Sequence, residues 1–129
     1  MIQLDRGDHR PIYEQIKEKI KELIISGALK ENDKMPSVRE LASTLTINPN
    51  TIQKAYRDLE SEGYIYSLRA KGSFVSPKKD VVKRSDTEEI LVEFEGLVTK
   101  MKFLGIAYEE AEKILINQYK GKDDERDKG

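Results

Sequence analysis

The 129-residue chain has no cysteine and no tryptophan, and His9 is its one histidine. Without cysteine it can form neither a disulfide framework nor a thiolate metal site. A metal centre would need carboxylates alone, and none are clustered in a suggestive way. No apolar run approaches the length of a membrane span, and the N-terminus lacks an apolar signal core. We therefore expect a cytoplasmic protein with no metal, no cofactor and no membrane partner.

An excess of positive charge is also missing, since 23 Lys and Arg stand against 24 Asp and Glu. A net charge of −1 is lower than nucleic-acid-binding domains usually carry. The charge is nevertheless unevenly distributed. Residues 1–79 hold 14 basic and 11 acidic side chains, or +3, whereas residues 80–129 hold 9 and 13, or −4. This asymmetry indicates that the two parts of the chain have different functions.

Three helices are predicted in the first part. Apolar residues step by three and four along residues 11–26, which places them on one helical face. Ser37 and Glu40 form a capping box at the start of a second helix, and Asn48 and Pro49 suit the cap and first position of a third. Two short helices joined by about three residues, each with one apolar stripe, are typical of a helix-turn-helix.

The hydrophobic period changes after Gly63. Residues 64–68 and 73–75 are predicted to be two short strands, with residues 69–72 as a tight turn between them. The tip of this hairpin is basic. The proline that follows breaks the pattern, so we expect the first domain to span residues 1–79.

The second part is predicted to be helical and to form a dimer. One helix begins near Asp86 and carries a heptad seam of two repeats, which is too short for a free coiled coil but adequate for a packed helix pair. Gly105 ends it, and a last helix completes a segment at residues 80–120. Residues 121–129 are charged, without any apolar side chain, and are predicted to be disordered. The expected dimer interface consists of Ile90, Phe94, Leu97, Met101, Leu104, Ile114 and Leu115.

We expect a second copy of the chain to pack against this seam. Two helices alone cannot bury both of their apolar faces against each other and still shield them from water. The alternative is that the two helices fold back on the first domain as the second layer of a monomer. The acidic balance of the segment favours a position away from phosphates.

A helix-turn-helix presents the start of its second helix to base edges in the major groove of DNA. At that place the chain has Asn50, Thr51, Gln53 and Lys54 around the apolar Ile52. Asn and Gln can hydrogen-bond adenine through two atoms, Thr offers a methyl and a hydroxyl, and Lys reaches guanine or phosphate. The alternative is that these are ordinary solvent-facing residues beside a buried stripe.

Two further places carry basic residues suited to a nucleic-acid backbone. Arg39, with Ser37 beside it, lies at a helix N-terminus, where the helix dipole and the guanidinium together favour a phosphate. Arg69 and Lys71 at the hairpin tip could enter the minor groove or hold the backbone, and Gly72 permits close approach. The alternative for Arg39 is an ion pair with a neighbouring acidic residue. The alternative for the hairpin tip is an ordinary solvent-exposed turn without a binding role.

The order of these elements resembles a known family. The segments PIYEQI and MPSVRELASTLTINPNTIQKAYRDLESEGYIYSLRAKGSFV, within residues 10–76, are similar to the DNA-binding domain of GntR-type bacterial regulators. The short two-helix tail resembles the YtrA-like branch, which lacks a larger ligand-binding domain. The resemblance implies a winged helix-turn-helix followed by a two-helix dimerisation module. The DNA-contacting positions of the family fall on Arg39, Asn50, Thr51, Gln53, Lys71 and Gly72.

The chain departs from the family pattern at two positions. Pro49 stands where some relatives begin the recognition helix with an Arg, so that contact is absent and the operator need not match theirs. Ala107 stands where such tails often have a Ser or Thr cap.

Functions other than DNA binding fit the sequence less well. An enzyme is disfavoured because no nucleophile–base pair, phosphate loop or metal spacing is visible. Aromatic residues such as Tyr66 and Phe74 could stack on single-stranded RNA, but at their spacing they suit a core or strand better. The main alternative is a protein-interaction module that uses a winged helix for docking without binding DNA. We expect a homodimeric, sequence-specific repressor that binds double-stranded DNA at an inverted repeat. The operator and a small-molecule effector are left open.

Overall fold

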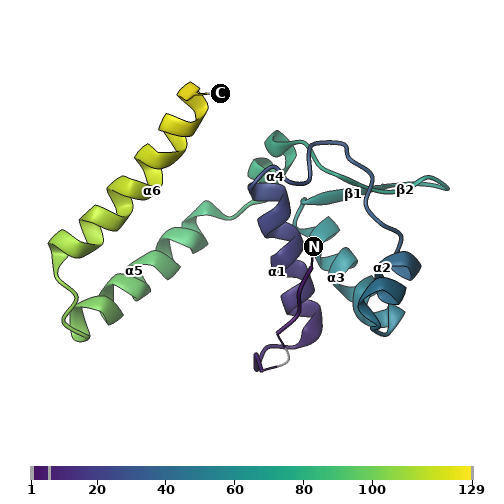
Figure 1. The fold of residues 1–129 in the computed structure, drawn as a ribbon, viewed down its shortest axis with the longest axis horizontal. Helices are drawn as coiled ribbons and strands as arrows, with labels where there is room; N and C mark the ends of the chain where they lie inside the picture. The colour runs from purple at the N-terminus through teal and green to yellow at the C-terminus, as the bar shows by residue number, and fades with distance from the viewer. Residues whose placement is uncertain (1, 6, 129) are drawn as a thin grey trace. The chain divides into compact units, whose positions relative to one another are not determined.

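Two units follow one another along the chain in the computed structural model, which describes residues 2–5 and 7–128, with side chains as far as Gly121. The first unit is Met1–Ser85 and the second is Asp86–Gly129. The elements are α1 (Ile12–Ile25), α2 (Val38–Leu45), α3 (Pro49–Ser61), β1 (Ile65–Leu68), β2 (Gly72–Val75), α4 (Lys78–Arg84), α5 (Thr87–Phe103) and α6 (Tyr108–Lys128) (Figure 1). The predicted fold class, mainly α with a small β-hairpin wing, is confirmed.

Local capping chemistry fixes the ends of α2 and α3. The Ser37 hydroxyl accepts a hydrogen bond from the Glu40 amide at 3.0 Å, and the Asn48 side chain accepts one from the Asn50 amide at 2.8 Å. Pro49 occupies the first turn of α3, where its missing N–H is not needed. Thr46 ends α2 in a left-handed conformation, with φ at 56°. The two helices are thereby joined by the short turn that the sequence predicted.

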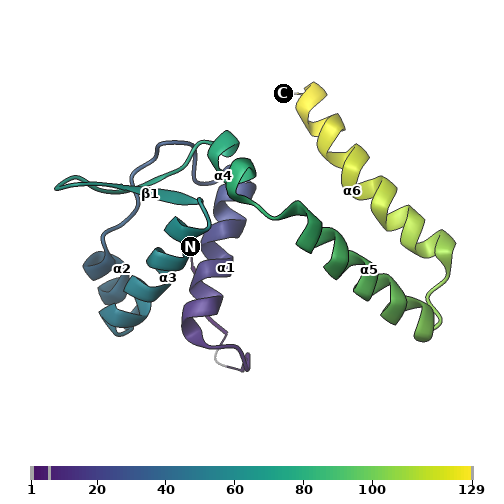
Figure 2. The same cartoon turned by 180° about the vertical axis from the view of Figure 1, so that it is seen from behind.

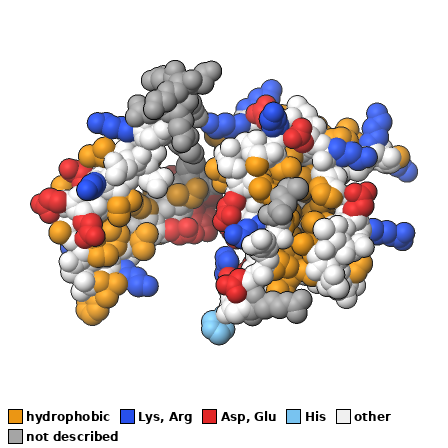
Figure 3. All heavy atoms as spheres, in the orientation of Figure 1, with side chains coloured by type: hydrophobic (Ala, Val, Ile, Leu, Met, Phe, Trp, Pro, Cys, Tyr) orange, Lys and Arg blue, Asp and Glu red, His pale blue; other side chains and the backbone are white. Residues whose placement is uncertain are grey.

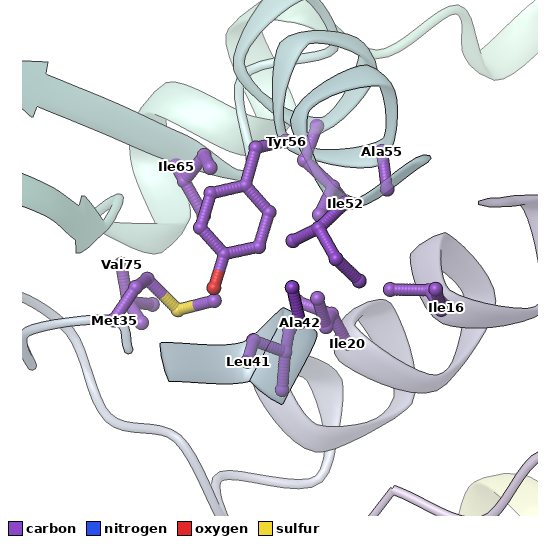
Figure 4. Packing of buried hydrophobic residues seen from close by; sticks show 11 residues of the cluster. Ile16, Ile20, Met35, Leu41, Ala42, Ile52, Ala55, Tyr56, Ile65 and Val75 are labelled. Atoms are coloured by element: carbon purple, nitrogen blue, oxygen red, sulfur yellow. The ribbon is translucent and has the colours of Figure 1, made fainter. Parts of the chain in front are cut away.

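The core of the first unit lies where α1, α2 and α3 meet. Figure 4 shows Ile52 and Tyr56 of α3 pointing toward apolar side chains of the neighbouring elements. Ile16 and Ile52 are fully buried, and each such side chain stabilises the fold by about 1.5–3 kcal/mol. The Tyr56 hydroxyl donates to the Pro36 carbonyl at 2.7 Å. Burial, together with the charge of Glu40, raises the pKa of Tyr56 to about 12.

The hairpin pairs β1 with β2 in antiparallel register, from Ile65 opposite Val75 to Leu68 opposite Gly72. The segment before α2 lies along the second strand. The Met35 amide donates to the Ser73 carbonyl at 2.8 Å, and the Val75 amide donates to the Asp33 carbonyl at 2.9 Å. This edge pairing fastens the wing to the helix-turn-helix.

The predicted domain boundary after residue 79 falls inside α4, and the first unit continues to Ser85. Pro77 is the N-cap residue that directly precedes this helix, so it does not end the first unit. The Arg84 guanidinium donates to the Glu60 carbonyl at 3.3 Å, at the end of α3. A Cβ at Gly63, whose φ is +87°, would lie 2.8 Å from Arg84 Cδ. Helix α4 is therefore docked closely onto the first unit.

The second unit consists of α5 and α6, which Figure 2 shows from behind. Asp86 caps α5 by accepting a hydrogen bond from the Glu89 amide at 3.0 Å, and Gly105, with φ at +79°, follows its end. Helix α6 continues to Lys128, and the predicted disorder of residues 121–129 stays a prediction. Position 129 lies outside the described residues.

No helix within residues 2–5 and 7–128 combines the length and the apolar composition that a bilayer crossing requires.

Candidate nucleic-acid interface

The outer face of α3 is the side of the helix turned away from the core. Ile52, Ala55, Tyr56 and Leu59 form the buried side. Asn50, Gln53 and Lys54 are exposed on the outer face, as predicted, whereas Thr51 is half-buried on its flank. The structure therefore brings three of the four predicted residues of α3 onto one exposed surface.

Arg57 also belongs to this outer face, and the sequence analysis missed it. It is exposed and follows Asn50 by seven positions and Lys54 by three, a spacing that places the three side chains along one side of a helix. That spacing is visible in the sequence. Extending the α3 stripe by one turn would have found the residue.

Arg39 lies in the first turn of α2 and is exposed. Among the residues that the structure describes, no carboxylate lies within ion-pair distance of its guanidinium. The Ser37 hydroxyl oxygen caps the helix as predicted, and its predicted contact with DNA stays a prediction. The guanidinium therefore keeps its donors and its charge for an external anion.

The wing tip is a three-residue loop, Arg69 to Lys71, closed by a hydrogen bond from the Lys71 amide to the Leu68 carbonyl at 3.0 Å. Arg69 and Lys71 are exposed, while Gly72, with φ at +107°, already belongs to β2. In Figure 3, basic side chains project at the edge of the first unit that carries the hairpin end and α2. The charge pattern of this edge suits a polyanion.

A ladder of side-chain contacts holds α3 against α1. The Lys54 ammonium lies 3.9 Å from the centre of the Tyr13 ring. Four residues further along both helices, Lys17 Nζ lies 3.7 Å from an Asp58 oxygen. One turn beyond, Lys21 Nζ lies 2.8 Å from Glu62 Oε1. Lys17 also reaches back to Glu62, at 2.8 Å from Oε2, so the far end of the ladder is a three-residue ion network.

This network changes the proton affinity of its members. Burial raises the pKa of the Glu62 carboxyl, but the hydrogen bonds and charges of Lys17 and Lys21 together outweigh burial and hold it below its usual range. For Lys17, burial lowers the pKa of the ammonium. The hydrogen bond and charge of Glu62 raise this pKa and outweigh burial, so the net shift is upward. Both shifts favour the charged, paired state.

Replacing Glu62 with Gln should lower the free energy of unfolding at neutral pH by about 1 kcal/mol, because two largely buried lysines lose their common partner. A carboxyl whose folded pKa is depressed contributes its stability above the unfolded pKa and loses it as pH falls. The difference between wild type and E62Q should therefore shrink below about pH 4.3. Denaturant melts across pH 3–7 measure this.

The matched control is Glu22→Gln, because Glu22 is 66% exposed and pairs with Lys19 at 3.5 Å within one helix. This change should alter stability by less than about 0.5 kcal/mol at every pH. An equal effect of the two substitutions would mean that the network adds nothing beyond a surface ion pair.

No group of three or more metal-ligating side chains occurs in the described ranges. The exposed cationic and amide side chains described above lie at the start of α2, on the outer face of α3 and at the wing tip.

Comparisons with known proteins agree with this geometry. Residues 12–75 match the family model described as "Bacterial regulatory proteins, gntR family". The HTH-type transcriptional repressor YtrA of Bacillus subtilis is 41% identical over 110 residues, which are 84% of this chain and 85% of that protein.

Solved structures show the same relationship. A transcriptional antiterminator from Listeria monocytogenes EGD-e is 35% identical with a TM-score of 0.78, covering 93% of this chain and 90% of that one. The DNA-binding domain of AraR in complex with operator ORE1 is 34% identical with a TM-score of 0.51, covering 59% of this chain and 93% of that one. The predicted resemblance is confirmed: the chain belongs to the gntR family of bacterial regulatory proteins.

Proposed function

We propose that the protein is a sequence-specific repressor that binds double-stranded DNA as a homodimer. The observation that carries this proposal is the set of exposed cationic and amide side chains on α2, α3 and the wing tip, whose cations form no ion pair with any residue in the described part of the chain. Relatives named as transcriptional repressors and a solved complex of a related domain with an operator support it. We expect it to act in the cytoplasm, as a regulator and not as an enzyme.

In the proposed complex, the start of α3 enters the major groove. Asn50 and Gln53 read base edges, with adenine as the natural partner of their amides. Arg39 at the start of α2 contacts a phosphate, as the charge and the helix N-terminus favour. Arg69 and Lys71 reach the minor groove or the backbone beside it, with Gly72 allowing close approach. Arg57 extends the α3 contact by one turn.

The second unit supports a dimer because its apolar side chains are uncovered within one chain. No residue of α5 is buried, and Leu97 and Ile114 are 55% and 57% exposed. The predicted seam is exposed throughout except at Met101, which is half-buried. Short helices gain most of their stability from packing an apolar face, which here requires another surface. A second copy supplies an identical surface and produces a symmetric interface.

A twofold dimer also explains specificity. One recognition helix contacts only a few base pairs, whereas two helices related by a twofold axis read half-sites about 34–36 Å apart. Residues 86–120 are therefore proposed as the dimerisation segment, with Ile90, Phe94, Leu97, Met101, Leu104, Ile114 and Leu115 in the interface.

Titration with duplex DNA of random sequence at several salt concentrations tests DNA binding against the protein-docking alternative. Each neutralised phosphate contributes about −0.9 to the slope of log affinity against log salt. Five cations per subunit, at Arg39, Lys54, Arg57, Arg69 and Lys71, would bring the slope of a dimer close to about −9. Absent or salt-independent binding would instead favour a module that docks proteins.

A further inference from the structure

The α1–α3 ladder consists of three side-chain contacts, which we call rungs, and they follow one another at intervals of four residues along both helices. The three rungs differ in chemistry. The second and third pair a lysine with a carboxylate, at Lys17–Asp58 and Lys21–Glu62. In the first rung Lys54 lies over the ring of Tyr13, 3.9 Å from its centre. This rung is the one nearest the start of α3, where the proposed DNA-contacting residues lie.

A carboxylate and an aromatic ring hold an ammonium with different consequences. A carboxylate cancels the charge, whereas the face of a ring attracts a cation through its quadrupole and leaves the full charge in place. Lys54 is exposed and shares the outer face of α3 with Asn50 and Arg57. Its charge therefore stays available to an anion, while its position is restricted by the ring.

The direction of the side chain indicates which anion Lys54 meets. Contact with Tyr13 draws the ammonium toward α1, to the flank of α3 that carries Asp58 one turn later. Base edges face the middle of a recognition helix, whereas the backbone of DNA lies to either side of it. The flank is therefore the place for a phosphate contact.

We propose that Tyr13 is a positioning residue for DNA binding, whose ring holds Lys54 beside the reading surface as a phosphate contact. The inference rests on the proposed DNA-binding role of α3. Tyr13 is half-buried and packs against the core of the first unit, so the ring is itself held. A lysine that is placed in advance loses less side-chain freedom when it binds.

A double-mutant cycle between Tyr13→Leu and Lys54→Met tests this, with affinity for duplex DNA of random sequence as the readout. Tyr13→Leu should weaken binding by about threefold to tenfold, consistent with loss of a cation–π contact. Lys54→Met should weaken binding and reduce the salt slope by about one unit for each subunit. In the Lys54→Met background, Tyr13→Leu should cause no further loss. Tyr13→Phe keeps the ring and should bind as wild type does.

The matched control is Tyr64→Leu, since the Tyr64 ring lies 5.1 Å from Lys21 at the opposite end of the ladder. It should leave DNA affinity unchanged, and thermal melting of each variant checks the fold. Equal losses from Tyr13→Leu in both lysine backgrounds would show a purely structural role and overturn the proposal. Stronger binding by Tyr13→Leu would also overturn it, because the ring would then compete with DNA for Lys54.

The outcome for Lys54→Met separates this inference from the proposed function. If Lys54→Met leaves affinity and salt slope unchanged while wild type binds DNA, the inference fails and the proposed function stands. If wild type does not bind any duplex, the proposed function fails with it.

Discussion

Replacing Leu97 with Glu should convert the proposed dimer into a monomer and abolish most specific DNA binding. Leu97 lies in the middle of the α5 seam, and a twofold axis would place two new carboxylates in the same apolar interface. A buried charge without a partner is destabilising by about 3–5 kcal/mol, and the dimer would contain two. Sedimentation at micromolar concentration measures the change in mass, and binding to the preferred operator measures its consequence.

Thr99→Glu is the matched control, because Thr99 is exposed on the side of α5 away from the seam and gains the same charge. It should leave the dimer intact. A chain shortened to end at Ser85 should behave as the Leu97→Glu variant does, since it retains α4 and the whole core of the first unit. A monomeric wild type, or a dimer that survives Leu97→Glu, would contradict the proposed interface.

Arg39→Ala and Gln53→Ala should weaken DNA binding in two different ways. Loss of a phosphate contact from Arg39 should reduce affinity for every duplex by a similar factor, about 1.5–3 kcal/mol per subunit for a charge-assisted hydrogen bond. The salt slope should fall by about one unit for each subunit. Gln53→Ala should cost about 1–3 kcal/mol at the preferred site alone and relax the preference at one or two base pairs.

Each variant serves as the control for the other. Affinities for the preferred site and for random duplex, together with selection from randomised sites, distinguish the two effects. If Arg39→Ala reduced only specific binding, the assignment of Arg39 to phosphate would be wrong. An unchanged base preference in Gln53→Ala would remove Gln53 from the residues that read sequence.

Local chemistry explains which parts of the fold could be predicted. The starts of α2 and α3 depend on Ser37, Asn48 and Pro49, which act on amides within a few residues, so the sequence alone indicated both helices. The buried stripe of α3 followed from its period. The outer face followed as the complement of that stripe, although Arg57 was overlooked.

Contacts between distant segments explain what the sequence did not reveal. The pairing of Met35 with Ser73 joins residues far apart in the chain, and no local pattern encodes it. Helix α4 was missed because Pro77 both ends one pattern and begins the next, and the contact of Arg84 with the end of α3 appears only in three dimensions. The Tyr13–Lys54 rung likewise requires the alignment of α1 with α3.

The short connection between α4 and α5 limits the spacing of the DNA half-sites that the proposed dimer can bind. Arg84 fastens α4 to the end of α3, and only Ser85 and Asp86 separate α4 from α5. Two extended residues span at most about 7 Å, which is the length of roughly two base-pair steps. Each added base pair also rotates one half-site by about 34° around the DNA axis, since a turn takes 10–10.5 base pairs. In the proposed dimer, a tether this short would restrict both the spacing and the rotation of the two half-sites, so the distance between half-sites would be part of the signal that is read.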